Sequence, residues 1–312
     1  MRSAASAKKI ASHAAPKADA DNTGLLGITL QCPRCAGLVQ NWVCSNCGLC
    51  VRTIEGVVHA LPPERVAYHA RFVEEYQQVC NGQVTDPPSD EYYLGLPYGI
   101  ASRHSSLGWS SRARNFDCLL GRVLKPALPR DARILDIGAG NCWLSYRLAL
   151  AGYSPCAIDL LTNDQHGLGA AKHYRNYLPE FFPRIRAEMA HLPFRDSQFQ
   201  AVIFNASLHY AEKAEVALRE ALRCCTPSGI VVISDTPMYH SAEQEKSSVT
   251  EPGSPLLTCE SVKSLESSLK IRWSVHYPPI GPTYTLRRVN GWLWSRAQIP
   301  HQPIYTARKM PK

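Results

Sequence analysis

Four cysteines near the N-terminus have the spacing of a metal site. They form two CxxC pairs, with eight residues between the pairs. Two such pairs on neighbouring hairpins surround one ion with four thiolates. This cage is typical of structural Zn²⁺, because it leaves no open position for water. The pattern predicts a zinc site whose ligands are Cys32, Cys35, Cys44 and Cys47, and it leaves Cys50 as a spare thiol.

A glycine-rich loop, Gly138-Ala139-Gly140, is the second candidate for chemistry. It follows Asp136 at the end of a predicted strand and precedes a predicted helix that begins at Trp143. Glycines let the backbone approach a ligand closely, and a helix N-terminus offers free amides to a negative group. A dinucleotide-binding loop carries glycine where Trp143 stands, so the pattern favours an adenosyl ligand. Asp159 ends the next predicted strand, where a carboxylate can accept ribose hydroxyls.

Strands and helices alternate beyond residue 130, and this order predicts the fold class. Strand patterns lie at 133–137, 155–159, 201–204 and 230–234, and helix patterns lie at 143–150 and 213–225. Such alternation is typical of an α/β, doubly wound and mostly parallel sheet. We expect a final antiparallel strand near 304–307, and a small zinc ribbon that forms a separate knob before the sheet.

The chain divides into four predicted segments. They are a disordered tail (1–28), the zinc ribbon (29–61), a helical lid or connector (62–129) and the doubly wound domain (130–312). The connector has helix patterns at 64–80 and 110–124, separated by a long loop at 81–108 that is rich in Gly, Pro, Asp and Ser. Residues 236–285 are expected to complete the lid.

Composition and charge limit the partners and the compartment. The net charge is +8, and residues 270–312 hold eight basic residues and no acid. Such a segment is either a solvated surface or a patch for phosphate or an acidic substrate. No apolar run is long enough for a membrane-spanning helix. The cysteines outside the cluster are scattered, and no secretory signal precedes them, so we expect reduced thiols and a cytoplasmic protein.

Over residues 130–235 the chain resembles the class I, seven-stranded methyltransferases, which use S-adenosylmethionine. The resemblance is carried by the loop 135–140, by Asp159, by the segment 188–194 and by Pro227-Ser228-Gly229. It implies a Rossmann-like, seven-stranded sheet and a cofactor site formed by Asp136, Gly138, Ala139, Gly140, Asp159, Leu160, Glu188, Met189 and Asn205. It also implies that Glu188 and Met189 flank the adenine ring.

Three further features refine the resemblance. The runs 141–145 and 205–210 are similar to those of a bacterial subgroup of the family. The ribbon is similar to those of zinc-ribbon rRNA guanine methyltransferases and of zinc-ribbon partner subunits of other methyltransferases. Cys142 departs from the pattern, because the family usually has a third glycine there; whether its side chain crowds the cofactor tail and weakens binding is left open.

Methyl transfer from a sulfonium requires alignment of the reactants and, for a protic acceptor, a base. His209 and Tyr210 follow the fourth strand of the resemblance, and we predict them as catalytic residues, with His209 as base or substrate orienter. The alternatives are that His209 is a loop histidine bonded to backbone and that Tyr210 only packs against the cofactor. Asp235 and Tyr239 follow the fifth strand and are further candidates, although Asp235 can equally cap a turn.

The methyl acceptor is left open between two classes. The zinc ribbon and the basic C-terminal segment favour RNA, whereas the aromatic residues of the predicted lid favour a small metabolite. The alternative function is a non-catalytic zinc-ribbon protein that binds nucleic acid or a partner and retains a degenerate methyltransferase fold. An NAD-dependent oxidoreductase is disfavoured by Trp143.

Overall fold

The structure is a computed structural model that describes residues 25–81, 89–99, 106–238, 257–278 and 302–309. Its centre is a nine-stranded sheet with the order β10-β11-β9-β8-β5-β6-β7-β4-β3. The strands are β3 (Arg52–Ile54), β4 (Val57–His59), β5 (Arg133–Ile137), β6 (Ser154–Asp159), β7 (Arg184–Arg186), β8 (Phe199–Asn205), β9 (Cys225–Ser234), β10 (Ile271–His276) and β11 (Ile304–Lys309). Strands β5 to β11 form the predicted seven-stranded sheet.

The pairing within these seven strands confirms the predicted fold class. Strands β7, β6, β5, β8 and β9 pair in parallel, each with the next. Strand β11 pairs antiparallel with β9, at the position predicted for the last strand, and β10 then pairs antiparallel with β11. The glycine-rich loop and Asp159 therefore lie at the carboxyl edge of the parallel strands, where open α/β sheets bind ligands.

The N-terminal segment is not a separate knob, which corrects the expectation. Its hairpin β3–β4 continues the sheet, because β4 pairs in parallel with the edge strand β7. Val58 lies opposite Ile185, and both are buried in one apolar core with Leu135 and Ile158. An uncovered edge strand leaves backbone donors and acceptors unpaired, and the hairpin satisfies those of β7.

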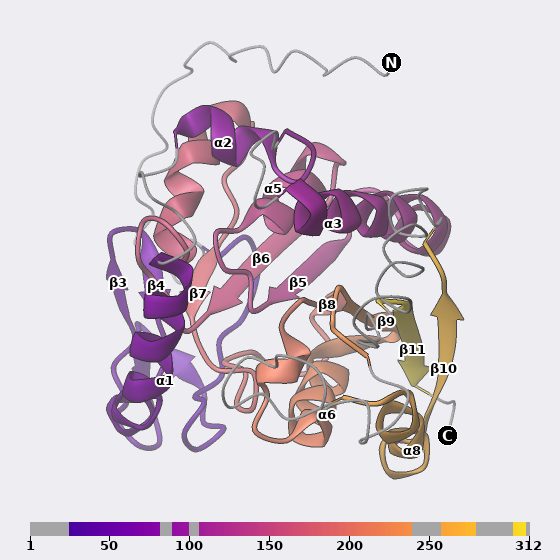
Figure 1. Ribbon diagram of the computed structural model, residues 1–312. Helices are drawn as coiled ribbons and strands as arrows, with labels where there is room; N and C mark the ends of the chain where they lie inside the picture. The colour runs from indigo at the N-terminus through magenta and orange to yellow at the C-terminus, as the bar shows by residue number, and fades with distance from the viewer. Residues whose placement is uncertain (1–24, 82–88, 100–105, 239–256, 279–301, 310–312) are drawn as a thin grey trace.

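Helices cover both faces of the sheet (Figure 1). One face carries α6 (Ala214–Cys224) and α8 (Cys259–Leu269), and the other carries α2 (Asp90–Gly95), α3 (Ser106–Cys118) and α5 (Trp143–Leu150). Successive side chains of β5 point to opposite faces of the sheet, so the strand contributes to both apolar cores. Leu135 and Ile137 belong to one core and Ile134 belongs to the other. The π-helical turn Leu119–Leu124 and the short α4 (Lys125–Ala127) lead from α3 toward β5.

The connector contains the two predicted helices and one that the sequence did not indicate. Helix α1 (Pro63–Asn81) and helix α3 with its π-helical turn match the patterns at 64–80 and 110–124. The expected loop at 81–108 contains α2, in which Ser89 caps the helix by accepting a hydrogen bond from the Tyr92 amide. Buried Tyr93 anchors α2 by stacking on His173, with ring centroids 4.3 Å apart. Among the described residues, no helix has both the length and the apolar character needed to cross a bilayer.

Candidate functional site

The four predicted metal ligands come together. Their sulfurs all lie within 4.8 Å of one another, with 3.5 Å between Cys32 and Cys47 and 3.5 Å between Cys35 and Cys44. Sulfurs around a tetrahedral Zn²⁺ lie roughly 3.8 Å apart, given a Zn–S bond of about 2.3 Å. The donor set and its spacing therefore fit zinc. Cys50 lies outside this group, and its thiol donates to the Gly48 carbonyl.

The turns around the cluster explain why the chain folds locally in this way. The hairpin of β1 (Val39–Gln40) and β2 (Val43–Cys44) carries one knuckle, and the amides of Asn46 and Cys47 point at the Cys44 sulfur over 3.4 and 3.5 Å. A Cβ at Gly37 would lie 2.9 Å from the same sulfur, so a larger residue there would intrude on the cage.

The glycine-rich loop has the backbone that the prediction requires. Gly138 has φ +71°, and a Cβ there would lie 2.4 Å from the Cβ of Ser207, which follows β8. Gly140 has φ +52°. Ser207 donates a 2.5 Å hydrogen bond to the Ile137 carbonyl and so holds the end of β8 against the loop. The loop can therefore present its backbone to a ligand only while position 138 lacks a side chain.

Two carboxylates flank this loop. Asp159 accepts hydrogen bonds of 2.8 Å from the amides of Gly140 and Leu161, and burial raises its pKa. Asp136 is buried and accepts a 2.8 Å bond from Ser145, while its Oδ1 has no partner among the described residues. Burial raises the pKa of Asp136 to about 7, and the nearby Asp159 adds to this, although the Ser145 bond opposes it.

Cys142, the residue that departs from the family pattern, lies beneath the loop. It adopts φ +63°, is fully buried and belongs to the apolar core beneath the loop. The neighbouring Trp143 packs edge-on against Trp109 and Phe116 of α3, with ring centroids 5.9 Å apart in both pairs. The indole thus joins α5 to α3, and this packing explains why a large residue is tolerated where a dinucleotide loop needs glycine.

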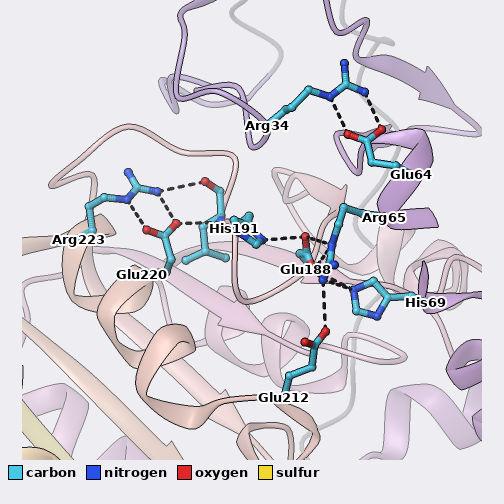
Figure 2. Close-up of polar contacts among 10 residues, drawn as sticks. Arg34, Glu64, Arg65, His69, Glu188, His191, Glu212, Glu220 and Arg223 are labelled. Atoms are coloured by element: carbon cyan, nitrogen blue, oxygen red, sulfur yellow. Dashed lines mark hydrogen bonds and ion pairs between the residues drawn. The ribbon is translucent and has the colours of Figure 1, made fainter. Parts of the chain in front are cut away.

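Glu188 is the most heavily bonded of the predicted cofactor residues (Figure 2). Arg65 donates to both of its carboxylate oxygens, over 2.8 and 2.5 Å, and His69 lies 2.8 Å from Oε2. His191 lies 2.9 Å from Oε1. Burial alone would raise the pKa of Glu188, but the bonds from His69 and Arg65 lower it to about 2. The carboxylate is therefore ionised and fixed.

The remaining predicted cofactor residues lie along the same edge. Ala187 donates from its amide to the Asp159 carbonyl over 3.1 Å, which places Glu188 and Met189 beside Asp159. Met189 is half-buried against the sheet core, Leu160 follows Asp159 directly and Ala139 is buried within the loop. Asn205 ends β8 and is buried.

The predicted catalytic pair lies in a short 3-10 turn after β8. The Nδ1 atom of His209 is buried without a hydrogen-bond partner among the described residues, and burial together with Arg112 lowers the His209 pKa to about 4. Tyr210 packs edge-on against Phe72 and Tyr76 of α1, with centroids 5.8 and 5.4 Å apart. His209 is therefore neutral near pH 7, whereas Tyr210 is part of an aromatic contact with the connector.

Asp235 proves to be part of a polar cluster, not only a turn residue. It follows β9 with φ +52°, is buried and accepts a hydrogen bond from Asn115 of α3. Its Oδ2 has no partner among the described residues. Burial raises its pKa to about 6, although Arg112 and Asn115 lower it. Tyr239, the other candidate after this strand, lies outside the described residues.

Four polar residues near the site were not predicted from the sequence. Arg65 and His69 stand at i and i+4 on α1, and Arg112 and Asn115 at i and i+3 on α3, so each pair shares one helix face. That spacing was the available signal, but it does not say what the face contacts. Of the basic C-terminal segment, Arg272 and Arg308 lie opposite each other on β10 and β11. Arg287, Arg288 and Arg296 lie outside the described residues.

Comparison with known proteins agrees with this arrangement. Residues 135–233 match the family model described as a methyltransferase domain. The malonyl-(acyl-carrier protein) O-methyltransferase of Enterobacter lignolyticus is 26% identical over 151 residues, which are 47% of this chain and 55% of that protein. The enzyme of the same name from Erwinia pyrifoliae is 31% identical over 114 residues, 36% of this chain and 41% of that protein. The chain thus matches about half or less of the length of these relatives.

A solved structure supports the same fold. The (4+2)-cyclase SpnF is similar over 78% of this chain and 95% of its own, with 16% identity and a TM-score of 0.52. That protein is a cyclase by name and is only distantly related in sequence, so the likeness concerns the fold and not a reaction. The matched segment begins within β5, spans the glycine-rich loop, Asp159 and Glu188, and ends within β9. Residues 135–233 of the chain are therefore similar to a methyltransferase domain, in agreement with the resemblance seen in the sequence.

Proposed function

We propose that this protein is a methyltransferase that binds S-adenosylmethionine along the carboxyl edge of β5, β6 and β7. The observation that carries the proposal is the loop at Gly138, where only a glycine fits against Ser207 and the backbone faces the edge of the sheet. Asp159 would accept the ribose hydroxyls, and Glu188 and Met189 would flank the adenine. The half-buried Asp159, fixed by two backbone amides, supports this role.

The bound cofactor would supply a methyl group that is already activated for displacement. The protein then has to align the acceptor and exclude water. We propose that the acceptor lies beyond β8 and β9, whose paired ends bring the His209 turn close to Asp235. Nδ1 of His209 and Oδ2 of Asp235, which have no hydrogen-bond partner within the described part of the chain, would orient the acceptor and take its proton.

The acceptor is proposed as a small metabolite or RNA whose reacting group carries a proton. The matched relatives are named for methylation of a malonyl group on acyl-carrier protein. Asp235 argues against such an anionic acceptor here, because one carboxylate repels another in a buried site. A cytoplasmic location and a structural role for zinc remain predictions.

The non-catalytic alternative loses its main support. It rested on Cys142 crowding the cofactor, and that side chain is buried in the core beneath the loop. Calorimetric titration of S-adenosylhomocysteine into the zinc-loaded, folded protein tests the proposal, with NAD⁺ as the control ligand. Micromolar binding of the first ligand alone is expected, and absence of binding would overturn the proposal.

A matched pair of variants sharpens this test. Gly138→Ala should abolish binding, because its Cβ would collide with Ser207. Gly152→Ala is the control, because Gly152 also has a positive φ, of +87°, but the added Cβ would meet no atom of the described residues within 4 Å, apart from its chain neighbours. Equal loss of binding in both variants would indicate backbone strain in general and would contradict the assignment of the loop.

A further inference from the structure

The acceptor capacity of Glu188 is filled by four donors (Figure 2). Oε1 faces Nε of Arg65 and Nδ1 of His191, and Oε2 faces Nη2 of Arg65 and Nε2 of His69. An ionised carboxylate offers about four lone-pair positions, and both histidine nitrogens must donate to it. A further donor, such as an amino group on a ligand, can therefore bind Glu188 only by replacing one of the four.

The four donors differ in how easily they can be replaced. His191 is only three residues from Glu188, and its side chain is 52% exposed. Arg65 and His69 come from α1, more than a hundred positions away, and their side chains are 25% and 13% exposed. The bidentate guanidinium is the strongest of these contacts, because its two parallel bonds match the carboxylate geometry. His191 is thus the donor that a ligand would displace.

Helix α1 also reaches the opposite end of the site. Phe72 and Tyr76 of this helix contact Tyr210, and Arg65 makes a 3.3 Å ion pair with Glu212 in the same segment. The helix therefore bridges the segment after β7 and the segment after β8. This bridge fixes the helix with respect to both ends, so that Arg65 and His69 meet Glu188 from a defined direction.

We propose that Arg65 and His69 are positioning residues that hold Glu188 as an ionised acceptor for the 6-amino group of adenine, so that the N-terminal segment completes the cofactor site. The inference rests on the proposed function, which places the adenine at Glu188. It goes further in assigning a specificity role to a helix that lies outside the matched domain. A neutral or rotated Glu188 would accept an amino group less well and would also tolerate a carbonyl there.

The test compares two ligands that differ at position 6 of the purine and, as a consequence, in whether N1 carries a hydrogen. S-inosylhomocysteine carries a carbonyl oxygen where S-adenosylhomocysteine carries the 6-amino group. The zinc-loaded full chain should bind the adenosyl ligand at least about 10-fold more tightly, because a carbonyl cannot donate to a carboxylate and is repelled by it. Arg65→Met should weaken binding of the adenosyl ligand about 10- to 100-fold and should narrow the preference between the two ligands.

The control variant lies on the same helix. Arg71 is 88% exposed and pairs with Glu75, so Arg71→Met should change neither affinity nor preference. Arg65→Lys keeps the charge but not the bidentate contact, and its preference for the adenosyl ligand should lie between those of the wild type and Arg65→Met. It replaces Arg65→Met in the test if that variant does not fold. Failure of the wild-type protein to bind either ligand would overturn the proposed function. Two results would overturn this inference and leave the proposed function intact. In one, the wild-type protein binds but shows no preference between the two ligands. In the other, Arg65→Met binds the adenosyl ligand as tightly as the wild type or more tightly.

Discussion

Asn115 donates a side-chain hydrogen bond to Asp235, although 120 positions separate the two residues in the chain. The contact ties α3 to the end of β9 and occupies Oδ1 of the carboxylate. Oδ2 remains buried and without a partner among the described residues. A buried carboxylate oxygen that lacks a donor destabilises the fold, and such groups are concentrated where a ligand supplies the missing partner.

Replacement of Asp235 by asparagine should raise the stability of the protein and lower its methyltransferase activity. Burial raises the Asp235 pKa to about 6, so its ionised form at neutral pH opposes folding. Asp235→Asn keeps the acceptor for Asn115 and removes the charge, and we expect a melting temperature a few °C higher and methyl transfer at least about 100-fold slower. Asp131→Asn, at an exposed turn, is the control and should change neither quantity. Full activity in Asp235→Asn would exclude Asp235 as a proton acceptor.

The rate of methyl transfer should rise with pH through about 6. Asp235 accepts a proton only when it is ionised, and its pKa is raised to about 6, so the rate is lost as the pH falls through that value. His209 does not contribute in this window, because burial and Arg112 lower its pKa to about 4 and keep it neutral. The measurement is the initial rate between pH 5 and 9 with both substrates saturating.

Asp235→Asn should lose this pH dependence and retain a low, flat rate. A rise that survives in the variant would instead belong to Asp136, whose pKa burial raises to about 7. The two carboxylates differ in surroundings, since Asp136 bonds to Ser145 beneath the loop and Asp235 lies at the end of β9. The variant therefore assigns the titration to one of them.

Local patterns were sufficient to predict much of this fold. The β-branched run before Asp235 predicted β9, and the CxxC pairs predicted four neighbouring sulfurs, because period and spacing are properties of short segments. The six-residue α2 was missed, since a short helix capped by Ser89 resembles a turn in composition. The edge pairing of β4 was missed as well, because a three-residue strand does not encode its partner.

The candidate site likewise has residues that local patterns predict and residues that they do not. Gly138 and Asp159 carry signals in their own segments, namely a glycine after a strand and an acid at the end of the next one. Arg65 and Asn115 contact residues 123 and 120 positions away, and the spacing within their own helices is equally common among solvated side chains. Their roles depend on how α1 and α3 cross the sheet, which follows from packing and not from local propensity.

Loss of the metal should destabilise the N-terminal segment. Cys47→Ser removes one ligand of the proposed zinc cage, whereas Cys50→Ser alters a nearby exposed thiol outside it. Cys47→Ser should reduce the zinc content below one ion per chain and lower the melting temperature, because metal binding and local folding are coupled. Zinc content by atomic emission and thermal unfolding provide the measurements. Equal zinc content in the two variants would contradict the ligand assignment.

The hairpin β3–β4 should stabilise the methyltransferase domain through the edge of its sheet. Val58 of β4 is 5% exposed and packs in the core opposite Ile185 of β7, whereas Ile54 of β3 is 49% exposed. Val58→Ala should lower the free energy of unfolding by about 1–3 kcal/mol, because it leaves a cavity in the shared core. Ile54→Ala should change it by less than about 0.5 kcal/mol. Urea unfolding followed by tryptophan fluorescence measures both, and equal effects would show that β4 adds little to the sheet that holds Asp159 and Glu188.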